Sequence, residues 1–299
     1  MKARSLIVLF LLAFAAGVRS SPAQRLTIDV NLTMLTARVS DEGGHAVLDL
    51  TADDFVLLQN GRPTPIEHFS LGSGPAGIGL LVDTSLSLRR MKSESEQMIG
   101  QLITPMTDND EVFLMTFASN SELVVKPTHR RAEITNAIGK VKSMAGTRFH
   151  DAVIDGLDVL SGIRQERKAL IILTDGADHY SSHTFPELLR TARLYGCEIY
   201  IIGYPGDDGR TLSEAGRSEI RSEFFRLAGE TGGQVFFPAN PRESFRVARQ
   251  IVDSLHHEYT FGFYSSHPFN EPSEVSIRIR GSRGEHLSVH TSLVPPPLP

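Results

Sequence analysis

The fold is decided by residues 78–87, Ile-Gly-Leu-Leu-Val-Asp-Thr-Ser-Leu-Ser, where an apolar run ends in a carboxylate followed by hydroxyl side chains. The apolar half has the length and composition of a strand that is buried on both faces, which is typical of parallel sheets. Asp83, Ser85 and Ser87 alternate directly after it, so a tight turn can direct these three side chains toward one point. The stretch therefore predicts a buried strand that delivers polar side chains to one edge of a sheet.

Apolar runs of strand length alternate with amphipathic segments from residue 78 to residue 256. The other predicted strands are 112–117, 169–173, 198–204 and 234–237. Apolar side chains between them recur at helical spacing, and the last predicted helix covers residues 241–256. This alternation predicts an α/β fold with a doubly wound, mostly parallel sheet.

The two flanking segments, residues 24–72 and 257–293, consist of short strands and turns. Asn60-Gly61 is a strong signal for a two-residue hairpin turn, and the Gly- and Pro-containing residues 72–77 predict a linker. Because each segment is too small for a stable sheet on its own, we expect the two to pair into a small all-β domain. Two independent β-units are the alternative interpretation. The proline-rich residues 294–299 are expected to form an extended tail.

Two more polar side chains are predicted to reach the same edge of the sheet. Thr147 precedes a predicted helix, at a position that favours an N-cap, and Asp175 follows the strand at residues 169–173. In an open parallel sheet, ligands gather where the strands end and the loops diverge. The sequence therefore predicts five candidate metal ligands in one place: Asp83, Ser85, Ser87, Thr147 and Asp175.

These five side chains offer only hard oxygen ligands. Two carboxylates and three hydroxyls suit Mg²⁺, Mn²⁺ or Ca²⁺ and do not suit zinc. The carboxylates cancel the charge of a divalent ion and the hydroxyls are neutral, so the metal stays electrophilic. One coordination position can be left to water, which a carboxylate from outside can replace. The expected partner is a protein ligand that donates an acidic side chain to the metal.

The pattern resembles the metal-ion-dependent adhesion site (MIDAS) of von Willebrand factor A (vWA) domains, D-x-S-x-S followed by Thr and Asp. The likeness runs from about Ile78 to Ser254, and the flanks are similar to those of exported bacterial vWA-related proteins. The resemblance implies that the hydroxyls approach the ion directly or through water, and that the two aspartates often act through water. It also implies metal-dependent protein binding or cell adhesion, and a last helix that shifts in some relatives when ligand binds. Leu86 stands where many members carry Gly, which would affect metal affinity rather than metal identity.

Two other functional classes compete with this interpretation. A magnesium-dependent hydrolase or phosphoryl-transfer enzyme usually needs a second carboxylate two residues after the first, and position 85 is Ser. The sequence also contains no Gly-rich phosphate loop and no H-E-x-x-H motif, so we expect that the protein is not an enzyme. A scaffold that binds through its β-domain, with an incidental metal site, is the other alternative.

Polar residues near the predicted site have simpler interpretations. Asp151, in the first turn of a predicted helix, is expected to be favoured by the helix dipole. Asp178 is expected to cap the next segment, and a position behind the metal ligands, where it would orient them, is the alternative. His150 and His179 are expected to be exposed loop residues, with a place at the rim of the site as the alternative.

The N-terminal residues carry an export signal. A short, positively charged start precedes an apolar run from Leu6 to Val18, and small residues follow at 21–23. This pattern predicts a secretory signal peptide, residues 1–23, with cleavage before Gln24. An uncleaved N-terminal anchor is the alternative, although the run is short for a bilayer. We expect the mature protein to be secreted or periplasmic, or associated with the envelope, and not inserted in a membrane.

Charge and cysteine content narrow the setting further. The formal net charge is −5 and becomes −8 after cleavage, because the signal peptide carries Lys2, Arg4 and Arg19 and no acidic residue. An acidic protein repels nucleic acid, so nucleic-acid binding is not expected. The single cysteine, Cys197, cannot form an internal disulfide and is expected to be buried in a strand. An exported chain without disulfides favours a bacterial envelope over an animal secretory pathway.

Overall fold

The computed structural model describes residues 32–42, 45–86, 88, 92–176, 178–204, 214–265, 274–281, 284 and 286–294. The predicted signal peptide, the predicted ligand Ser87 and residues 295–299 of the predicted tail lie outside this set. Within it, the helices fall short of the length and apolarity that a bilayer crossing would require.

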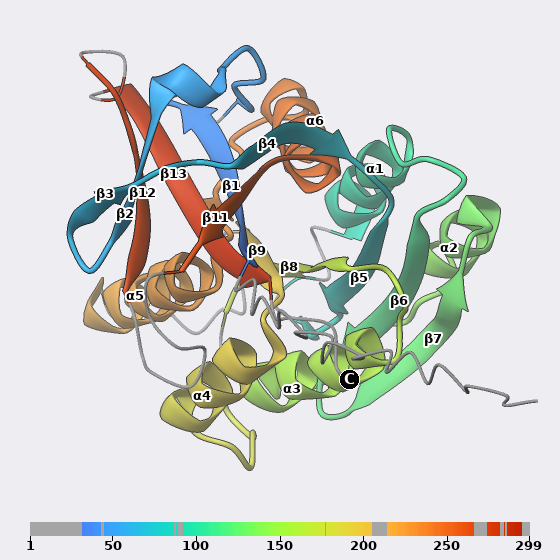
Figure 1. Ribbon diagram of the computed structural model, residues 1–299. Helices are drawn as coiled ribbons and strands as arrows, with labels where there is room; N and C mark the ends of the chain where they lie inside the picture. Colours follow the sequence, from blue (N-terminus) through green and yellow to red (C-terminus); the bar gives the residue numbers. More distant parts are fainter. Residues whose placement is uncertain are drawn as a thin grey trace, which may run out of the picture. The chain divides into compact units, whose positions relative to one another are not determined.

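A six-stranded sheet forms the centre of the α/β region, in the order β10-β9-β8-β5-β6-β7 (Figure 1). Its strands are β5 (Ala76–Asp83), β6 (Glu111–Phe117), β7 (Ser121–Thr128), β8 (Arg167–Thr174), β9 (Glu198–Gly203) and β10 (Val235–Phe236). All pair in parallel except β7, which is antiparallel to β6. Every residue of β5 is buried between β6 and β8, as its continuous apolar sequence predicts.

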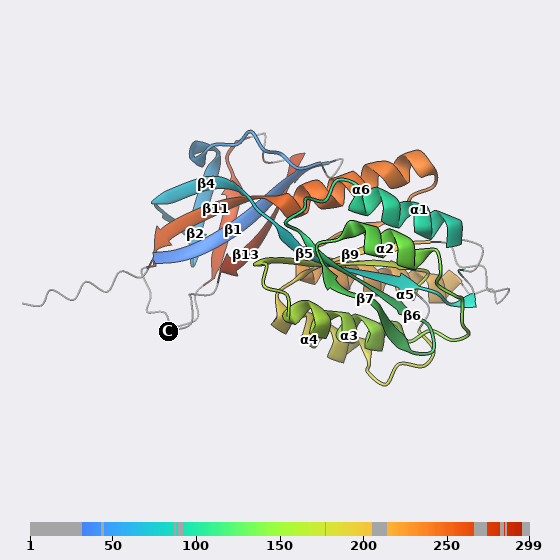
Figure 2. The same cartoon turned by 90° about the vertical axis from the view of Figure 1, so that its right-hand side faces the viewer.

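Helices cover both faces of this sheet (Figure 2). One face carries α1 (Lys92–Ile103), α2 (Arg131–Ile138) and α6 (Pro241–His256), and the other carries α3 (Phe149–Ser161), α4 (Phe185–Tyr195) and α5 (Glu214–Thr231). Alternate side chains of the central strands divide between two cores, so that Leu80 packs with the first group and Leu81 with the second. The predicted doubly wound, mostly parallel α/β fold is confirmed.

The flanking segments combine into a β-region of two sheets that share one core (Figure 1). A four-stranded antiparallel sheet contains β13 (Leu287–Val294), β1 (Leu32–Asp41), β11 (His257–Tyr264) and β4 (His68–Ser73), in that order. A three-stranded sheet contains β12 (Val275–Ile279), β2 (Phe55–Gln59) and β3 (Arg62–Thr64), and a short 3-10 turn, η1 (Ala52–Asp54), precedes β2. Between the sheets, the rings of Phe55 and Phe261 meet edge-on at 4.9 Å. Since β1 lies between β11 and β13, the two flanks do form the all-β part.

Some boundaries differ from the prediction. Only residues 74 and 75 separate β4 from β5, so most of the predicted 72–77 linker is strand. Glycine occurs there because of crowding, since a Cβ on Gly77 would lie 2.5 Å from the Ile163 side chain. The antiparallel β7 has no counterpart in the prediction. At the other end, β13 includes Val294, which was assigned to the tail.

The α/β region is inserted at one point of the β-region. β4 leads into β5, and α6 passes directly into β11 at His256 and His257. Ser73 and His257, the residues at the two crossings, are cross-strand partners. Ion pairs join residues of the two regions close to these crossings: Arg38 with Glu198, and Arg167 with Glu258.

Candidate metal centre

Three loops meet at the carboxyl edge of the central sheet, and each brings residues that the sequence singles out. Asp83 ends β5 and Ser85 lies in the loop that follows, and each is only 3% exposed. Thr147, which is equally buried, lies in the segment before α3. Asp175 follows β8 and is half-buried. Ser87, the fifth predicted ligand, lies outside the described residues.

Backbone hydrogen bonds hold the three loops together. The N–H of Met144 donates to the Thr84 carbonyl at 3.0 Å, and Met144 also forms an isolated parallel bridge with Ser85. The Thr147 carbonyl accepts a hydrogen bond from the N–H of Tyr180 at 3.3 Å. The loop before α3 is therefore tied both to the loop after β5 and to the loop after β8.

Thr147 does not cap α3 as predicted. The helix begins at Phe149, and Arg148 is its N-cap residue. Thr147 lies one position earlier, where its carbonyl accepts hydrogen bonds from N–H groups of the loop after β8.

The Asp83 carboxylate is the most constrained group of the site. Its Oδ1 accepts a hydrogen bond from the N–H of Ser85 at 2.8 Å, and the Ser85 side chain also hydrogen-bonds to the carboxylate. Its Oδ2 accepts from the Thr174 hydroxyl at 2.7 Å. Burial, together with the negative charge of Asp175, raises the pKa of Asp83 well above its usual range, and these hydrogen bonds offset only part of the effect. Two carboxylates therefore repel each other in a place with little water.

These groups fit a hard divalent cation. Asp83 and Asp175 supply carboxylates and Ser85 and Thr147 supply hydroxyls, and a cation would relieve the repulsion that raises the pKa of Asp83. Among the described residues, no group of three or more His, Cys, Asp or Glu side chains is placed to hold a metal. A site with two carboxylates and hydroxyls is not of that kind, and its metal ligands stay a prediction.

Asp178 fastens the loop after β8 to α3. Its Oδ1 accepts from the N–H of Tyr180 at 3.2 Å, and its Oδ2 accepts from the N–H of His150 at 3.1 Å and lies 3.0 Å from His150 Nδ1. Burial disfavours a charged imidazole, but hydrogen bonds to Asp178 and Glu223 outweigh burial and raise the pKa of His150 to about 10. The same ion pair holds the pKa of Asp178 well below its usual range, against the effect of burial. Of the two histidines, only His179 is an exposed loop residue.

Asp151 organises the far end of the same loop. Its carboxylate accepts from the N–H groups of Ser182 and His183 at 2.9 and 3.0 Å, and it also contacts the Arg148 guanidinium. These contacts outweigh desolvation and lower the pKa of Asp151 to about 2. Asp151 therefore positions a loop, a role beyond the helix-dipole effect that the sequence indicates.

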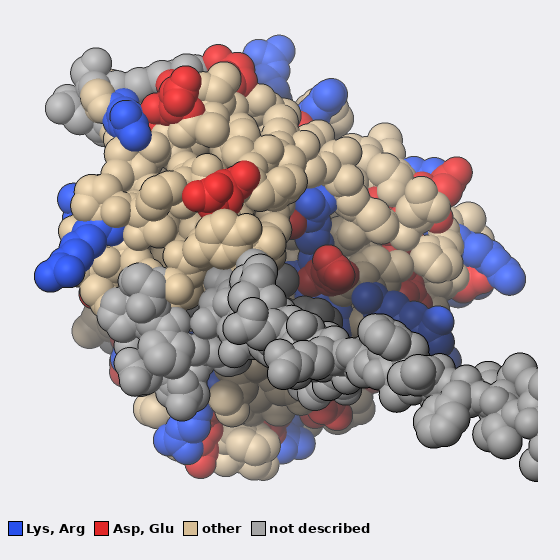
Figure 3. All heavy atoms as spheres, viewed as in Figure 1, with Lys and Arg blue, Asp and Glu red and all other residues tan. Residues whose placement is uncertain are grey.

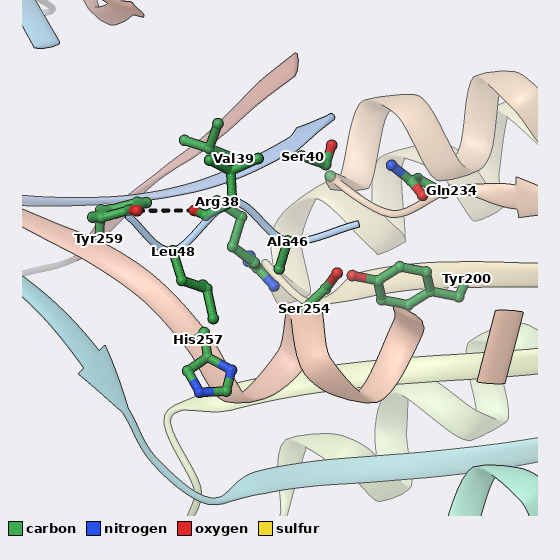
Figure 4. A pocket seen from close by; sticks show the side chains of 12 residues that line it. Arg38, Val39, Ser40, Ala46, Leu48, Tyr200, Gln234, Ser254, His257 and Tyr259 are labelled. Atoms are coloured by element: carbon green, nitrogen blue, oxygen red, sulfur yellow. Dashed lines mark hydrogen bonds between the residues drawn. The ribbon is translucent and has the colours of Figure 1, made fainter. Parts of the chain in front are cut away.

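A small pocket elsewhere in the molecule does not compete with this site. It lies where β1 meets the end of α6, and Figure 4 shows the Arg38 side chain extending into it toward Ser254 and Tyr200. Its volume of about 20 Å³ is room for about one water molecule. The carboxyl edge of the sheet is therefore the better candidate for ligand binding.

Comparison with known families decides what the α/β region is. Residues 78–177, which include all five predicted ligands, match the family described as the von Willebrand factor type A domain. The α/β region has the fold of a vWA domain.

The chain is also similar, at low sequence identity, to several solved structures. The chain is similar to a von Willebrand factor type A protein from Catenulispora acidiphila, with 11% identity, 89% of this chain and 74% of that chain covered, and a TM-score of 0.51. It is also similar to an aerotolerance-related membrane protein from Bacteroides fragilis (16% identity, 60% and 98% covered, TM-score 0.49). A third similar structure is the pilus adhesin SpaC from Lactobacillus rhamnosus GG (12% identity, 76% and 43% covered, TM-score 0.49). At these identities the likeness concerns the fold alone. No curated protein matches the sequence.

In the α/β region, Thr174 is a site residue that sequence reasoning missed. It is fully buried at the end of β8, donates to Asp83 and accepts from the N–H of Gly176 at 2.9 Å. The strand register pairs Val82 with Leu173, so the next residue on each strand is Asp83 and Thr174. A hydroxyl in the last position of a buried strand is the signal that could have identified it.

Proposed function

We propose that the protein binds a partner protein through a divalent cation held at the carboxyl edge of its vWA domain. The cation would be Mg²⁺, or Mn²⁺ or Ca²⁺ in its place, and its ligands would come from five residues: Asp83, Ser85, Ser87, Thr147 and Asp175. When bound, the ion supplies positive charge and a coordination position for an acidic side chain of the partner. The protein's own part is to orient these oxygens and to keep the loops together.

The buried Asp83 carboxylate is the observation that carries the proposal. Hydrogen bonds from Ser85 and Thr174 fix its position and offset only part of the effect of burial and of the Asp175 charge, which disfavour its charged form without a counter-charge. An uncompensated buried charge costs stability, and a divalent cation would offset the charge of the buried Asp83 together with that of the half-buried Asp175. Two neighbouring carboxylates, Asp83 and Asp175, at the point where three loops meet are therefore expected if these loops bind a cation.

We further propose that the role is non-catalytic adhesion or interaction, outside a bacterial cytoplasm. The N-terminal signal pattern supports export, and the sequence lacks the phosphate-loop and metalloprotease motifs noted above. On the face shown in Figure 3, Lys and Arg side chains are dispersed among acidic ones, which favours a protein partner over a nucleic acid.

Metal binding by the mature chain tests the proposal. We expect Mn²⁺ to bind in calorimetry and in electron paramagnetic resonance titrations, to be released by chelator, and to compete with Mg²⁺. The Asp83→Ala variant should lose this binding, whereas Asp53→Ala, an exposed aspartate of η1, should retain it. Circular dichroism is used to check that both variants are folded. Equal Mn²⁺ binding by folded Asp83→Ala, or none by the unmodified chain, would refute the proposal.

A further inference from the structure

Each of the three loops of the candidate site exposes one large apolar side chain. Leu86 is 53% exposed in the loop after β5, Met144 is 47% exposed before α3, and Tyr180 is 63% exposed after β8. Single exposed apolar residues are ordinary, but apolar residues gathered around a site mark a surface that binds something. We call these three residues the collar.

The collar residues lie close to the buried polar groups. Leu86 directly follows Ser85, and Met144 forms the backbone bridge with Ser85. Tyr180 is hydrogen-bonded through its N–H to Thr147, and its ring lies 3.3 Å from where a Cβ on Gly146 would be. The backbone contacts of Met144 and Tyr180, and the position of Leu86 next to Ser85, place the three residues beside the segments that carry Ser85 and Thr147.

Two depressions adjoin the collar. One, of about 420 Å³, is lined by Tyr180 together with Ser119, Ala145, Gly146 and Arg148. The other, of about 300 Å³, lies beside Met144. Its charged lining residues are Lys140, Lys142 and Glu122, and both lysines are exposed. Depressions of this size accommodate side chains of a partner, and their basic residues outnumber the acidic one.

We propose that the collar selects a protein segment in which one acidic side chain is flanked on both sides by apolar side chains. This inference rests on the proposed function, because the acidic side chain is the group that meets the metal. The apolar neighbours would then cover Leu86, Met144 and Tyr180 and exclude water from the metal–carboxylate contact. A segment of net negative charge is favoured further by Lys140 and Lys142.

This assignment gives Leu86 a specific role. Leu86 places a large apolar side chain, 53% exposed, directly beside the buried Ser85. A residue that only adjusted the turn would not need to be large and apolar. The collar therefore discriminates among acidic partners by the side chains next to the acidic one. The metal alone contacts only the acidic side chain and cannot make this distinction.

The test uses the mature chain with Mg²⁺ and fluorescein-labelled nonapeptides followed by fluorescence polarisation. One peptide has a central aspartate with leucine or phenylalanine at the two positions on either side, a second has serine at those positions, and a third has the apolar flanks around asparagine. The collar variant replaces Leu86, Met144 and Tyr180 by serine. Its matched control replaces three other exposed apolar residues by serine: Leu194, Phe225 and Phe245.

We expect the apolar-flanked acidic peptide to bind at least about tenfold more tightly than the serine-flanked one, since burial of even half of each collar side chain contributes this much. The collar variant should lose that preference while it binds Mn²⁺ like the unmodified chain, and the control variant should keep the preference. If the chain binds Mn²⁺ but binds the two acidic peptides equally, or binds no peptide, the inference is overturned and the proposed metal site is unaffected. If the unmodified chain does not bind Mn²⁺, or if the asparagine peptide binds as tightly as the apolar-flanked aspartate peptide, the result counts against the proposed function on which the inference rests.

Discussion

The hydroxyl of Thr174 donates a hydrogen bond to Asp83 Oδ2 over 2.7 Å, and both residues are buried at the carboxyl ends of neighbouring parallel strands. Thr174→Val keeps the shape but leaves a buried carboxylate oxygen and the Gly176 N–H without this partner. We expect the free energy of unfolding to fall by about 1–3 kcal/mol and Mn²⁺ affinity to fall with it. Thr174→Ser should restore both. Calorimetric Mn²⁺ titration and urea unfolding measure the effects, and unchanged affinity in Thr174→Val would exclude a positioning role.

Removal of one site carboxylate should change stability and metal binding in opposite directions. In Asp175→Asn the negative charge that helps to raise the pKa of Asp83 is gone, so the metal-free protein is expected to be more stable at neutral pH. Mn²⁺ affinity should fall because a charged ligand is lost. Urea unfolding with chelator present, beside the Mn²⁺ titration, gives both quantities. A variant that loses stability in chelator would show that the carboxylates do not oppose each other.

Gly176 should tolerate no side chain. Its φ is +82°, and an added Cβ would lie 2.2 Å from the ring of Phe224 and 2.5 Å from the Ile220 side chain on α5. Gly176→Ala should therefore lower the free energy of unfolding by about 2–4 kcal/mol, the sum of backbone strain and overpacking. Gly196→Ala is the matched control, because Gly196 also has a positive φ but has open space around its Cβ position. Thermal and urea unfolding compare the two, and equal losses would mean that crowding is unimportant.

The His150–Asp178 pair should make stability depend on pH. The raised pKa of His150, about 10, means that its contribution is complete below the unfolded value of about 6.5 and is lost as pH rises toward 10. The lowered pKa of Asp178 means that its contribution is complete above about pH 4 and is lost in acid. The stability difference between the natural chain and His150→Asn should therefore be largest near pH 5–6 and shrink toward pH 10.

Urea unfolding at about pH 5.5, 7.5 and 9.5 measures this difference. The exposed His179→Asn serves as the control and should show little effect. A difference that is constant or grows in alkali would mean that His150 is not held as a cation.

The predictable parts of the fold are those with a local pattern. β5 and β8 are apolar runs buried on both faces. The helix predicted at residues 241–256 from apolar side chains at helical spacing is α6. β7 was not predicted because Lys126 and Pro127 interrupt its apolar pattern. A doubly wound fold of parallel strands also does not require an antiparallel strand at its edge. Position 77 is a strand residue that must be glycine, because Ile163 leaves no space for a side chain. This requirement comes from packing and cannot be read from the local sequence.

The residues of the candidate site also fall into two groups, those with a local sequence signal and those placed by contacts distant in the sequence. Asp83, Ser85 and Asp175 could be found because they directly follow buried strands. The contacts of Asp151 with Ser182 and His183 span more than thirty residues, and nothing in the local sequence identifies them. Thr174 was passed over since its partner Asp83 is a neighbour only through the strand register.

The single insertion point has a mechanical consequence. β4 and β11 are adjacent antiparallel strands, and everything between Ser73 and His257 occupies the place of a hairpin turn. The first and last described strands, β1 and β13, both belong to the β-region, where Met34 lies opposite Val294. Tension applied between the Met34 end of β1 and the Val294 end of β13 would open the β1–β13 ladder pair by pair from that end. The vWA domain would carry none of this load, and the loops around Asp83 would keep their arrangement while the chain is pulled.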